Sequence, residues 1–148
     1  NLISEEDKRR ATIHLLLSYV EEHYAEKLSL EDLADYAQYN RTYVSTLFKQ
    51  MVGINFHEYL TRVRFQHALN DLTYTRDNLT DIALKNGFPD LKTLTARFRS
   101  TFQRTPAQYR AALKPDEVLY DKVRQFLDPQ DMVLRKKLGE YAKTGIIK

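Results

Sequence analysis

The residues best suited to chemistry are hydrogen-bonding and cationic side chains at helical spacing. They are Thr42, Ser45, Thr46 and Lys49. Intervals of three and four residues place them on one helix face, and an apolar stripe of Val44, Leu47, Phe48 and Met51 occupies the other. Three hydroxyls and an ammonium group without a carboxylate could bind a polar, negatively charged partner. The simpler interpretation is the solvated face of an ordinary amphipathic helix.

Histidine, the usual metal ligand and general base, is poorly placed for either role. His14 and His23 are nine residues apart, about half a turn round a helix, so one helix could not bring both to one metal. The stretch HEYLT at 57–61 lacks the second histidine of the zinc motif H-E-x-x-H, and the chain contains no phosphate-binding loop motif. We therefore expect neither an enzyme nor a metal or other cofactor.

Composition bounds the remaining possibilities. The 148 residues are 43% hydrophobic and 29% charged, which suits one compact unit or two very small ones. A net charge of +3 is only a weak sign of an anionic partner. Without cysteine, a signal peptide or a long apolar run, the chain is expected to be soluble, cytoplasmic and in a reducing compartment. Because it begins at Asn1 without methionine, we expect a piece of a longer protein.

Helical periodicity runs through nearly the whole chain and predicts an all-α fold. Only four glycines and four prolines interrupt it. In the fourth helix Arg62, Arg64 and His67 are expected on the solvent side. The predicted helices are 9–24, a short one from Leu30 to Ala37 capped by Ser29, one capped by Asn40, 59–72, one capped by Thr80, 91–102, and a last one begun by Thr105-Pro106, with periodic stretches at 116–127 and 132–142 beyond them.

The sequence contains an approximate internal repeat. Leu30, Asp32, Leu33, Ala34 and Tyr39 recur 49 positions later as Leu79, Asp81, Ile82, Ala83 and Phe88. After one inserted residue, Val44, Phe48, Lys49 and Tyr59 recur 50 positions later as Leu94, Phe98, Arg99 and Tyr109. Each copy is a short helix, a turn and a second amphipathic helix, which is the layout of a helix-turn-helix. Ala34 and Ala83 supply the small side chain that closely crossing helices need.

Charge is distributed the same way in both copies. The repeat relates the first polar stripe to Lys92, Thr95, Ala96 and Arg99, and neither stripe contains an acid. Carboxylates gather instead on or just before the first helix of each copy, at Glu31, Asp32, Asp35, Asp77 and Asp81. A surface that approaches phosphates must avoid carboxylates, because they oppose the release of counterions that favours binding. The second helix of each copy is therefore predicted to enter the major groove of DNA.

Residues 28–110 resemble the DNA-binding domain of the AraC/XylS family of bacterial transcription regulators. The stretches that carry the resemblance are LSLEDLA at 28–34, LFKQMVG at 47–53, IALKNGF at 82–88 and TPAQYR at 105–110. It implies seven helices, with two helix-turn-helix units joined by a long helix, and recognition helices that enter successive major-groove segments roughly 34 Å apart. It also implies a sensor or dimerisation domain in the full-length chain and RNA polymerase as a candidate partner.

The expected domain layout follows this resemblance. A double helix-turn-helix DNA-binding domain covers 9–112, with units at about 12–57 and 73–112 and a linker helix at about 58–72. Such a linker is about 20 Å long at 1.5 Å per residue, which is compatible with the groove spacing if the DNA bends. Residues 113–148 are expected to form a helical extension or linker of unknown role.

Site residues are carried over position by position. The base-reading candidates are Arg41, Thr42, Ser45, Thr46, Leu91, Lys92, Thr95 and Ala96. Lysine can bind guanine O6 or N7, hydroxyls can bond several base edges, and apolar side chains can touch a thymine methyl group. The phosphate-binding candidates are Lys49, Arg62, Arg97, Arg99 and Arg104, and Tyr109 and Arg110 are expected to be structural. The alternative for each cation is a place on a solvated helix face.

Two positions depart from the family pattern. Thr46 and Ala96 are short where a long polar chain is common, which favours a larger share for DNA shape in recognition. Gln38 stands where the second copy has Gly87, so a left-handed turn there costs of order 1 kcal/mol more than with glycine. The alternative function is a helical protein-interaction module whose basic faces bind an acidic partner, and DNA mobility at low salt would separate the two.

Overall fold

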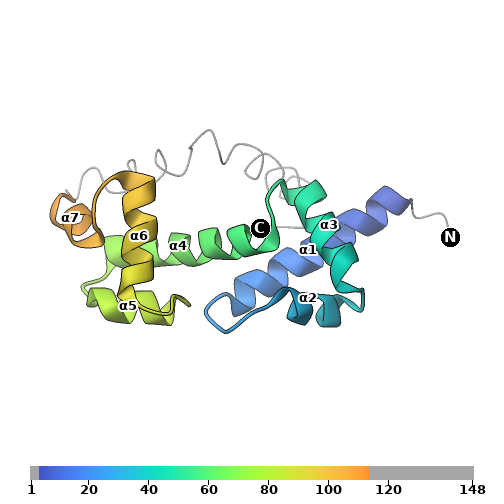
Figure 1. Cartoon of the computed structure of the whole chain (residues 1–148), viewed down its shortest axis with the longest axis horizontal. Coiled ribbons are helices and arrows are strands. Elements are labelled where there is room, and N and C mark those ends of the chain that lie inside the picture. The colour runs from blue at the N-terminus through green and yellow to red at the C-terminus, as the bar shows by residue number, and fades with distance from the viewer. Residues whose placement is uncertain (1–3, 114–148) are drawn as a thin grey trace. The chain divides into compact units, whose positions relative to one another are not determined.

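The computed structural model describes residues 4–113, which contain seven helices and no strand (Figure 1). The helices are α1 (Glu5–His23), α2 (Leu30–Ala37), α3 (Arg41–Val52), α4 (Phe56–Tyr74), α5 (Leu79–Lys85), α6 (Leu91–Phe102) and α7 (Pro106–Ala111). The prediction of an all-α fold is confirmed. The stretches expected to be helical at 116–127 and 132–142 lie outside the described residues.

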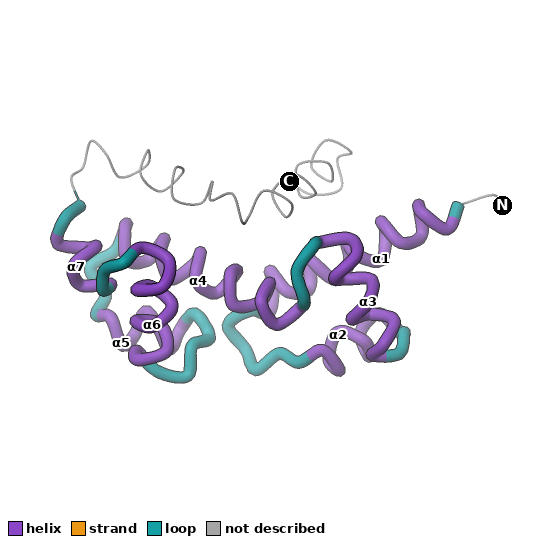
Figure 2. The backbone as a smooth tube through the Cα atoms, turned by 45° about the horizontal axis from the view of Figure 1, so that its top comes forward, coloured by secondary structure: helices purple, strands orange, loops and turns teal. Residues whose placement is uncertain are grey.

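These residues divide into two compact units. The first holds residues 4–23 and 28–60, and the second holds 24–27 and 61–113. Short loops join consecutive helices within each unit, as Figure 2 shows in teal. The division falls inside α4, between Leu60 and Thr61, so the first turns of this helix belong to one unit and the remainder to the other.

The first unit is built on the apolar stripes of α1 and α3. The α1 residues Ile13, Leu16, Leu17 and Val20 are buried. The predicted apolar stripe of α3, Val44, Leu47, Phe48 and Met51, is buried too. The Phe48 ring packs edge-on against Phe56 and Tyr59, with centroids 5.8 and 5.3 Å away. The start of α4 thus closes the core that α1, α2 and α3 form.

The second unit has a core rich in aromatic rings. Helices α4, α5, α6 and α7 contribute Phe65, Leu69, Leu72, Ile82, Leu94, Phe98 and Tyr109 to it. Phe98 lies at the centre, with its ring 5.4 Å from Phe65, 5.0 Å from Phe102 and 5.3 Å from Tyr109. The structural role expected for Tyr109 is therefore confirmed, because it is 2% exposed and packs within this core.

Each helix-turn-helix is delimited by side chains that cap the helix ends. Ser29 and Thr105 form capping boxes with Asp32 and Gln108, and Asn40 accepts from the Tyr43 N–H. These three N-caps were predicted. A hydroxyl, carboxylate or amide oxygen at the N-cap satisfies a main-chain N–H that the helix leaves without an internal partner.

The predicted cap at Thr80 is wrong. The structure begins α5 at Leu79, so Thr80 lies inside the helix, and Asn78 is the N-cap. The Asn78 side-chain oxygen accepts from the Asp81 N–H at 2.8 Å, and its amide nitrogen donates to the Asp81 carboxylate at 3.0 Å. Both residue types cap helices well, and this second bond to Asp81 favours the earlier one.

Helix α4 is longer than the predicted 59–72. It begins at Phe56, after Asn55 accepts from the Glu58 N–H at 2.8 Å, and it continues to Tyr74. Its buried residues form two stripes, Phe56, Tyr59, Leu60 and Val63, followed by Phe65, Ala68, Leu69 and Leu72. The second stripe starts two residues after the first ends, where one continuous stripe would continue after three or four. A search for one continuous apolar stripe therefore underestimates the length of this helix.

Candidate nucleic-acid interface

Helix α3 presents the polar stripe that the sequence predicted. Thr42, Ser45, Thr46 and Lys49 are all exposed, while Val44, Leu47 and Phe48 are fully buried. Asn40 fixes the start of the helix, and Gly53, in the left-handed conformation with φ 95°, ends it. The core of the first unit therefore holds α3 firmly and leaves three hydroxyls and an ammonium group directed to solvent.

Helix α6 presents a more mixed face. Lys92, Ala96 and Arg99 are exposed, whereas Leu91 and Thr95 are half-buried. Leu91 packs against the core of the second unit, so only part of its side chain remains for contact with a thymine methyl group. Lys92 and Arg99 are the two members of this face that carry charge into solvent.

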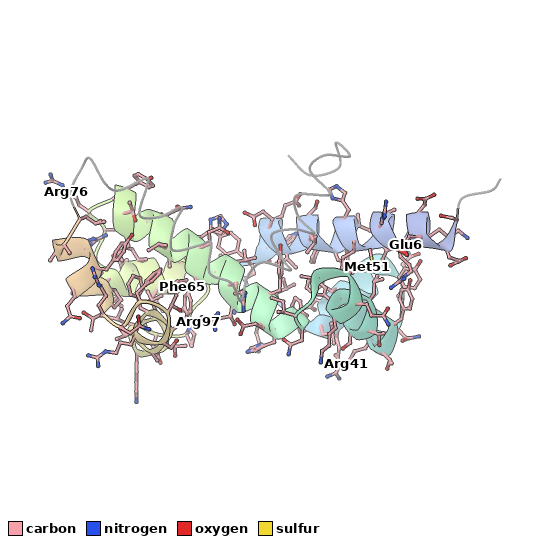
Figure 3. All side chains as sticks on the ribbon, turned by 90° about the horizontal axis from the view of Figure 1, so that it is seen from above. Glu6, Arg41, Met51, Phe65, Arg76 and Arg97 are labelled. Carbon is pink, nitrogen blue, oxygen red and sulfur yellow. The ribbon has the colours of Figure 1, made fainter. Side chains whose placement is uncertain are left out.

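Acidic groups lie next to the start of each of these helices. The guanidinium of Arg41 is 3.6 Å from the Glu31 carboxylate of α2, with both side chains well exposed, so the pair is weak. Arg41 is the first residue of α3 and is labelled in Figure 3. Asp90 is the N-cap of α6 and accepts from the Thr93 hydroxyl and N–H, both at 2.7 Å. These bonds lower the pKa of Asp90 and direct the bonded carboxylate oxygen toward the helix.

The phosphate-binding candidates differ in how much of each cation is available. Lys49, Arg99 and Arg104 are exposed. Arg62 and Arg97 are half-buried, and one guanidinium nitrogen of each, Nη1 of Arg62 and Nε of Arg97, is fully covered by protein. The first three can approach a phosphate from solvent, while Arg62 and Arg97 can offer only their remaining N–H groups.

Arg64 does not lie on a solvent-facing side of its helix, contrary to the prediction. Its Nε donates to the main-chain carbonyl of Tyr24 at 2.7 Å, and its Nη2 donates to that of Glu26 at 2.8 Å. Burial lowers the pKa of Arg64. His67 also turns inward, with its ring stacked on Tyr24 at 4.0 Å and 9° between planes. Both side chains hold the 24–27 segment on the second unit, and no local pattern marks them for this.

Gly87 lies directly against the hydrogen bond between Arg64 and the Tyr24 carbonyl. A Cβ at this position would lie 2.5 Å from Arg64 Nε and 2.8 Å from the Tyr24 carbonyl oxygen, and its φ of 93° is left-handed. Only glycine adopts this φ without strain and also leaves the Arg64 side chain in place. The turn between α5 and α6 is thereby tied to the segment that precedes α2.

Arg110 performs a similar task at the other loop, which confirms the structural role expected for it. It donates to the carbonyl oxygens of Leu72 at 3.1 Å, Thr75 at 3.1 Å and Asp77 at 2.6 Å. The loop between α4 and α5 is further held by Lys85, whose Nζ is 2.8 Å from the Asp77 carboxylate and 3.4 Å from that of Asp71. The hydrogen bond from Lys85 lowers the pKa of Asp77. Arg110 therefore stabilises the fold of the second unit.

Two other kinds of feature are absent from the described part of the chain. Among residues 4–113, no three histidine, aspartate or glutamate side chains gather as a metal site would require. In the same range, no helix is long and apolar enough to cross a membrane.

A family model described as a helix-turn-helix domain matches residues 33–112, which is more than half of the chain. An HTH-type transcriptional regulator of Staphylococcus aureus (strain COL), itself named as uncharacterized, is 38% identical over 98 residues. The match covers 66% of this chain and 13% of that protein. The chain thus spans about an eighth of the length of this relative.

Solved structures show the same fold. A transcriptional regulator of Chromobacterium violaceum, titled as an AraC-type DNA-binding domain protein, is 28% identical with a TM-score of 0.64, over 69% of this chain and 91% of that one. The DNA-binding domain of AdpA, solved in complex with a target DNA, is 26% identical with a TM-score of 0.63, over 66% of this chain and 88% of that one. Together with the repeated capped helices and their exposed polar stripes, these matches show that the chain belongs to the family of AraC-type helix-turn-helix DNA-binding domains.

Proposed function

We propose that this chain is the DNA-binding part of a bacterial transcription regulator and that α3 and α6 read successive segments of the major groove. The observation that carries the proposal is that the second helix of each helix-turn-helix leaves a face without carboxylates open to solvent. The family is a class of DNA-binding domains and not of enzymes. The DNA complex of the similar AdpA domain supports DNA as the partner here.

The residue roles form part of the proposal. Base edges would be read by Arg41, Thr42, Ser45 and Thr46 on α3 and by Leu91, Lys92, Thr95 and Ala96 on α6. Phosphates would be bound mainly by Lys49, Arg99 and Arg104, because these cations are exposed. Arg62 and Arg97 would contribute less, since part of each guanidinium is covered.

We also propose how this domain fits into the full-length regulator. The DNA-binding domain would cover 9–112, with units at about 12–57 and 73–112, and residues 113–148 would lie outside it. Because the chain matches 13% of the S. aureus relative, a sensor or dimerisation domain would belong to the remainder of the full-length protein. RNA polymerase is the partner through which such a regulator would act, in the bacterial cytoplasm where the chromosome lies.

Selection of bound duplexes from random DNA would test this function. We expect an enriched site with two conserved segments about one helical turn, roughly 34 Å, apart, and a footprint that protects both. Lys92→Ala should relax selection at one or two base pairs of one segment, whereas Ser45→Ala should act on the other. A chain that binds neither selected nor random duplex at low salt is not a DNA-binding domain, and it would favour the protein-interaction alternative.

The spacing can be tested on the selected duplex itself. Insertion of five base pairs between the two conserved segments places them on opposite sides of the helix, and we expect this to abolish protection of one segment. Insertion at an equally distant position outside the site is the matched control. Equal protection of both segments after the internal insertion would show that the two recognition helices do not read one face of the duplex.

A further inference from the structure

Exposed tyrosines gather on the first unit, outside the proposed reading face. Tyr36 in the last turn of α2 is 47% exposed, Tyr39 in the turn after this helix is 45% exposed, and Leu15 of α1 is 42% exposed. The Tyr19 ring lies 4.1 Å from that of Tyr36, and Tyr19 shares a helix face with Leu15 four residues earlier. We call Leu15, Tyr19, Tyr36 and Tyr39 the aromatic face.

Carboxylates lie beside the aromatic face. In the parts of the first unit at 11–23 and 28–40, the sequence has five acids and no lysine or arginine, and Arg41, which follows directly, pairs with one of these acids, Glu31, at 3.6 Å. Glu22 continues the helix stripe of Leu15 and Tyr19, and Asp32 and Asp35 neighbour Tyr36 on α2. Carboxylates repel phosphates, so this surface does not suit nucleic acid. Exposed apolar area with carboxylates beside it is typical of a protein-binding surface, and the partner should be apolar and cationic.

The chain itself contains a segment with this chemistry. Residues 132–148 carry the five bases Arg135, Lys136, Lys137, Lys143 and Lys148 against one acid, Glu140. Their apolar residues include Leu134, Leu138 and Tyr141 at helical spacing. The 18 residues at 114–131 separate this segment from the described domain, and the covalent link raises the effective concentration of the segment near the aromatic face. A covalently attached partner therefore needs only modest intrinsic affinity.

We propose that the C-terminal segment 132–148 binds in cis to the aromatic face of the first unit. Its apolar side chains would cover Tyr36 and Tyr39, and its lysines would pair with Glu22 and Asp35. This contact would use α1, α2 and the turn after α2, where Tyr39 packs on Tyr43 of α3 at 4.5 Å, and it would leave the polar stripe of α3 open. It assigns residues 132–148 a place on the domain, without a direct part in reading DNA.

The absence of cysteine from the chain allows a direct test. A nitroxide spin label on Lys137→Cys in the full chain should broaden the amide resonances of Tyr36 and Tyr39, which should lose most of their intensity and regain it when ascorbate reduces the label. Charge reversal with Glu22→Lys and Asp35→Lys should restore at least half of that intensity. Adding Lys136→Glu and Lys143→Glu to the reversed chain should bring the broadening back.

Matched controls separate the charge effect from misfolding. Glu5→Lys with Asp7→Lys makes the same change of charge on α1 outside the aromatic face, and it should leave the broadening intact. Circular dichroism should report equal helicity for all variants. Undiminished Tyr36 and Tyr39 signals in the labelled chain would overturn the proposal, and so would broadening that survives the Glu22 and Asp35 reversals. Broadening of an isotope-labelled chain by a separate spin-labelled copy would also overturn it, because the segment would then bind in trans.

Discussion

At the scale of single residues, the arginines of this domain divide into two groups. Arg64 and Arg110 each donate to main-chain carbonyls of a loop that leads into the first helix of a helix-turn-helix. Arg99 and Arg104 are exposed. A planar guanidinium with five donors can satisfy several carbonyls at once, which an ammonium group on a flexible stem does less well. The number of basic residues therefore overstates the charge available for DNA.

Arg64→Ala should lower the free energy of unfolding by about 2 kcal/mol, because two hydrogen bonds from a charged donor are lost. Urea denaturation followed by circular dichroism measures this. Arg76→Ala is the control, since this arginine is exposed and its replacement should change stability by less than about 0.5 kcal/mol. Equal stability of the two variants would mean that the contacts of Arg64 with Tyr24 and Glu26 do not stabilise the fold.

Gly87→Ala should destabilise more than Gly53→Ala. The two glycines have similar φ values, 93° and 95°, so alanine costs roughly 1 kcal/mol of backbone conformation at either. At Gly87 the new methyl group would also collide with Arg64 and the Tyr24 carbonyl. We expect an additional loss of about 1–3 kcal/mol from this overpacking, measured as the difference between the two denaturation curves. A difference near zero would contradict the close approach.

At the scale of elements, the two helix-turn-helix copies use glycine and glutamine in exchanged places. The turn after the first helix has Gln38 with φ 61° in one copy and Gly87 in the other, and the end of the second helix has Gly53 and then Gln103 with φ 56°. Gln38 does adopt the left-handed conformation, the case in which a cost of about 1 kcal/mol relative to glycine is expected. Each copy thus meets one left-handed position with glycine and one with a strained glutamine, and the geometry of the turn persists across the exchange.

Two substitutions at the start of α5 test whether Asn78 or Thr80 caps this helix. Asn78→Ala should lower stability by about 1 kcal/mol, because the Asp81 N–H loses its side-chain acceptor. Thr80→Ala should be neutral or slightly stabilising, since alanine is the better residue inside a helix. Thermal or urea unfolding of the two variants gives the comparison. The opposite order would restore Thr80 as the cap.

At the scale of the whole molecule, a net charge of +3 conceals a strong separation of charge along the chain. Residues 91–114 carry six bases and no acid, while 11–40 carry six acids and a single lysine. The basic range includes the helix proposed to bind phosphates, and the acidic range includes the face proposed to bind a cationic segment. Averages over a sequence cannot report this, because long-range attraction depends on where charges gather.

Salt dependence of DNA binding should show whether the exposed Arg99 contacts a phosphate. If Arg99 contacts a phosphate, Arg99→Ala should weaken binding to every duplex and reduce the slope of log affinity against log salt by about 1. Lys8→Ala should leave the slope unchanged, because this lysine lies in the acidic first turn of α1 and pairs with Glu5 at 3.5 Å. Fluorescence anisotropy over a salt series measures both. An unchanged slope for Arg99→Ala would remove it from the phosphate contacts.

The sequence by itself determined the repeat, the positions of most helices, three of their N-caps and the stripes of α3 and α6. These features depend on intervals of three and four residues and on cap chemistry, which are local. Only the tertiary structure decided which cations remain available, why Gly87 must be glycine and where α4 begins and ends. Arg64 meets Tyr24 across 40 positions and Arg110 meets Leu72 across 38, and contacts at such separation leave no periodic mark in a single sequence.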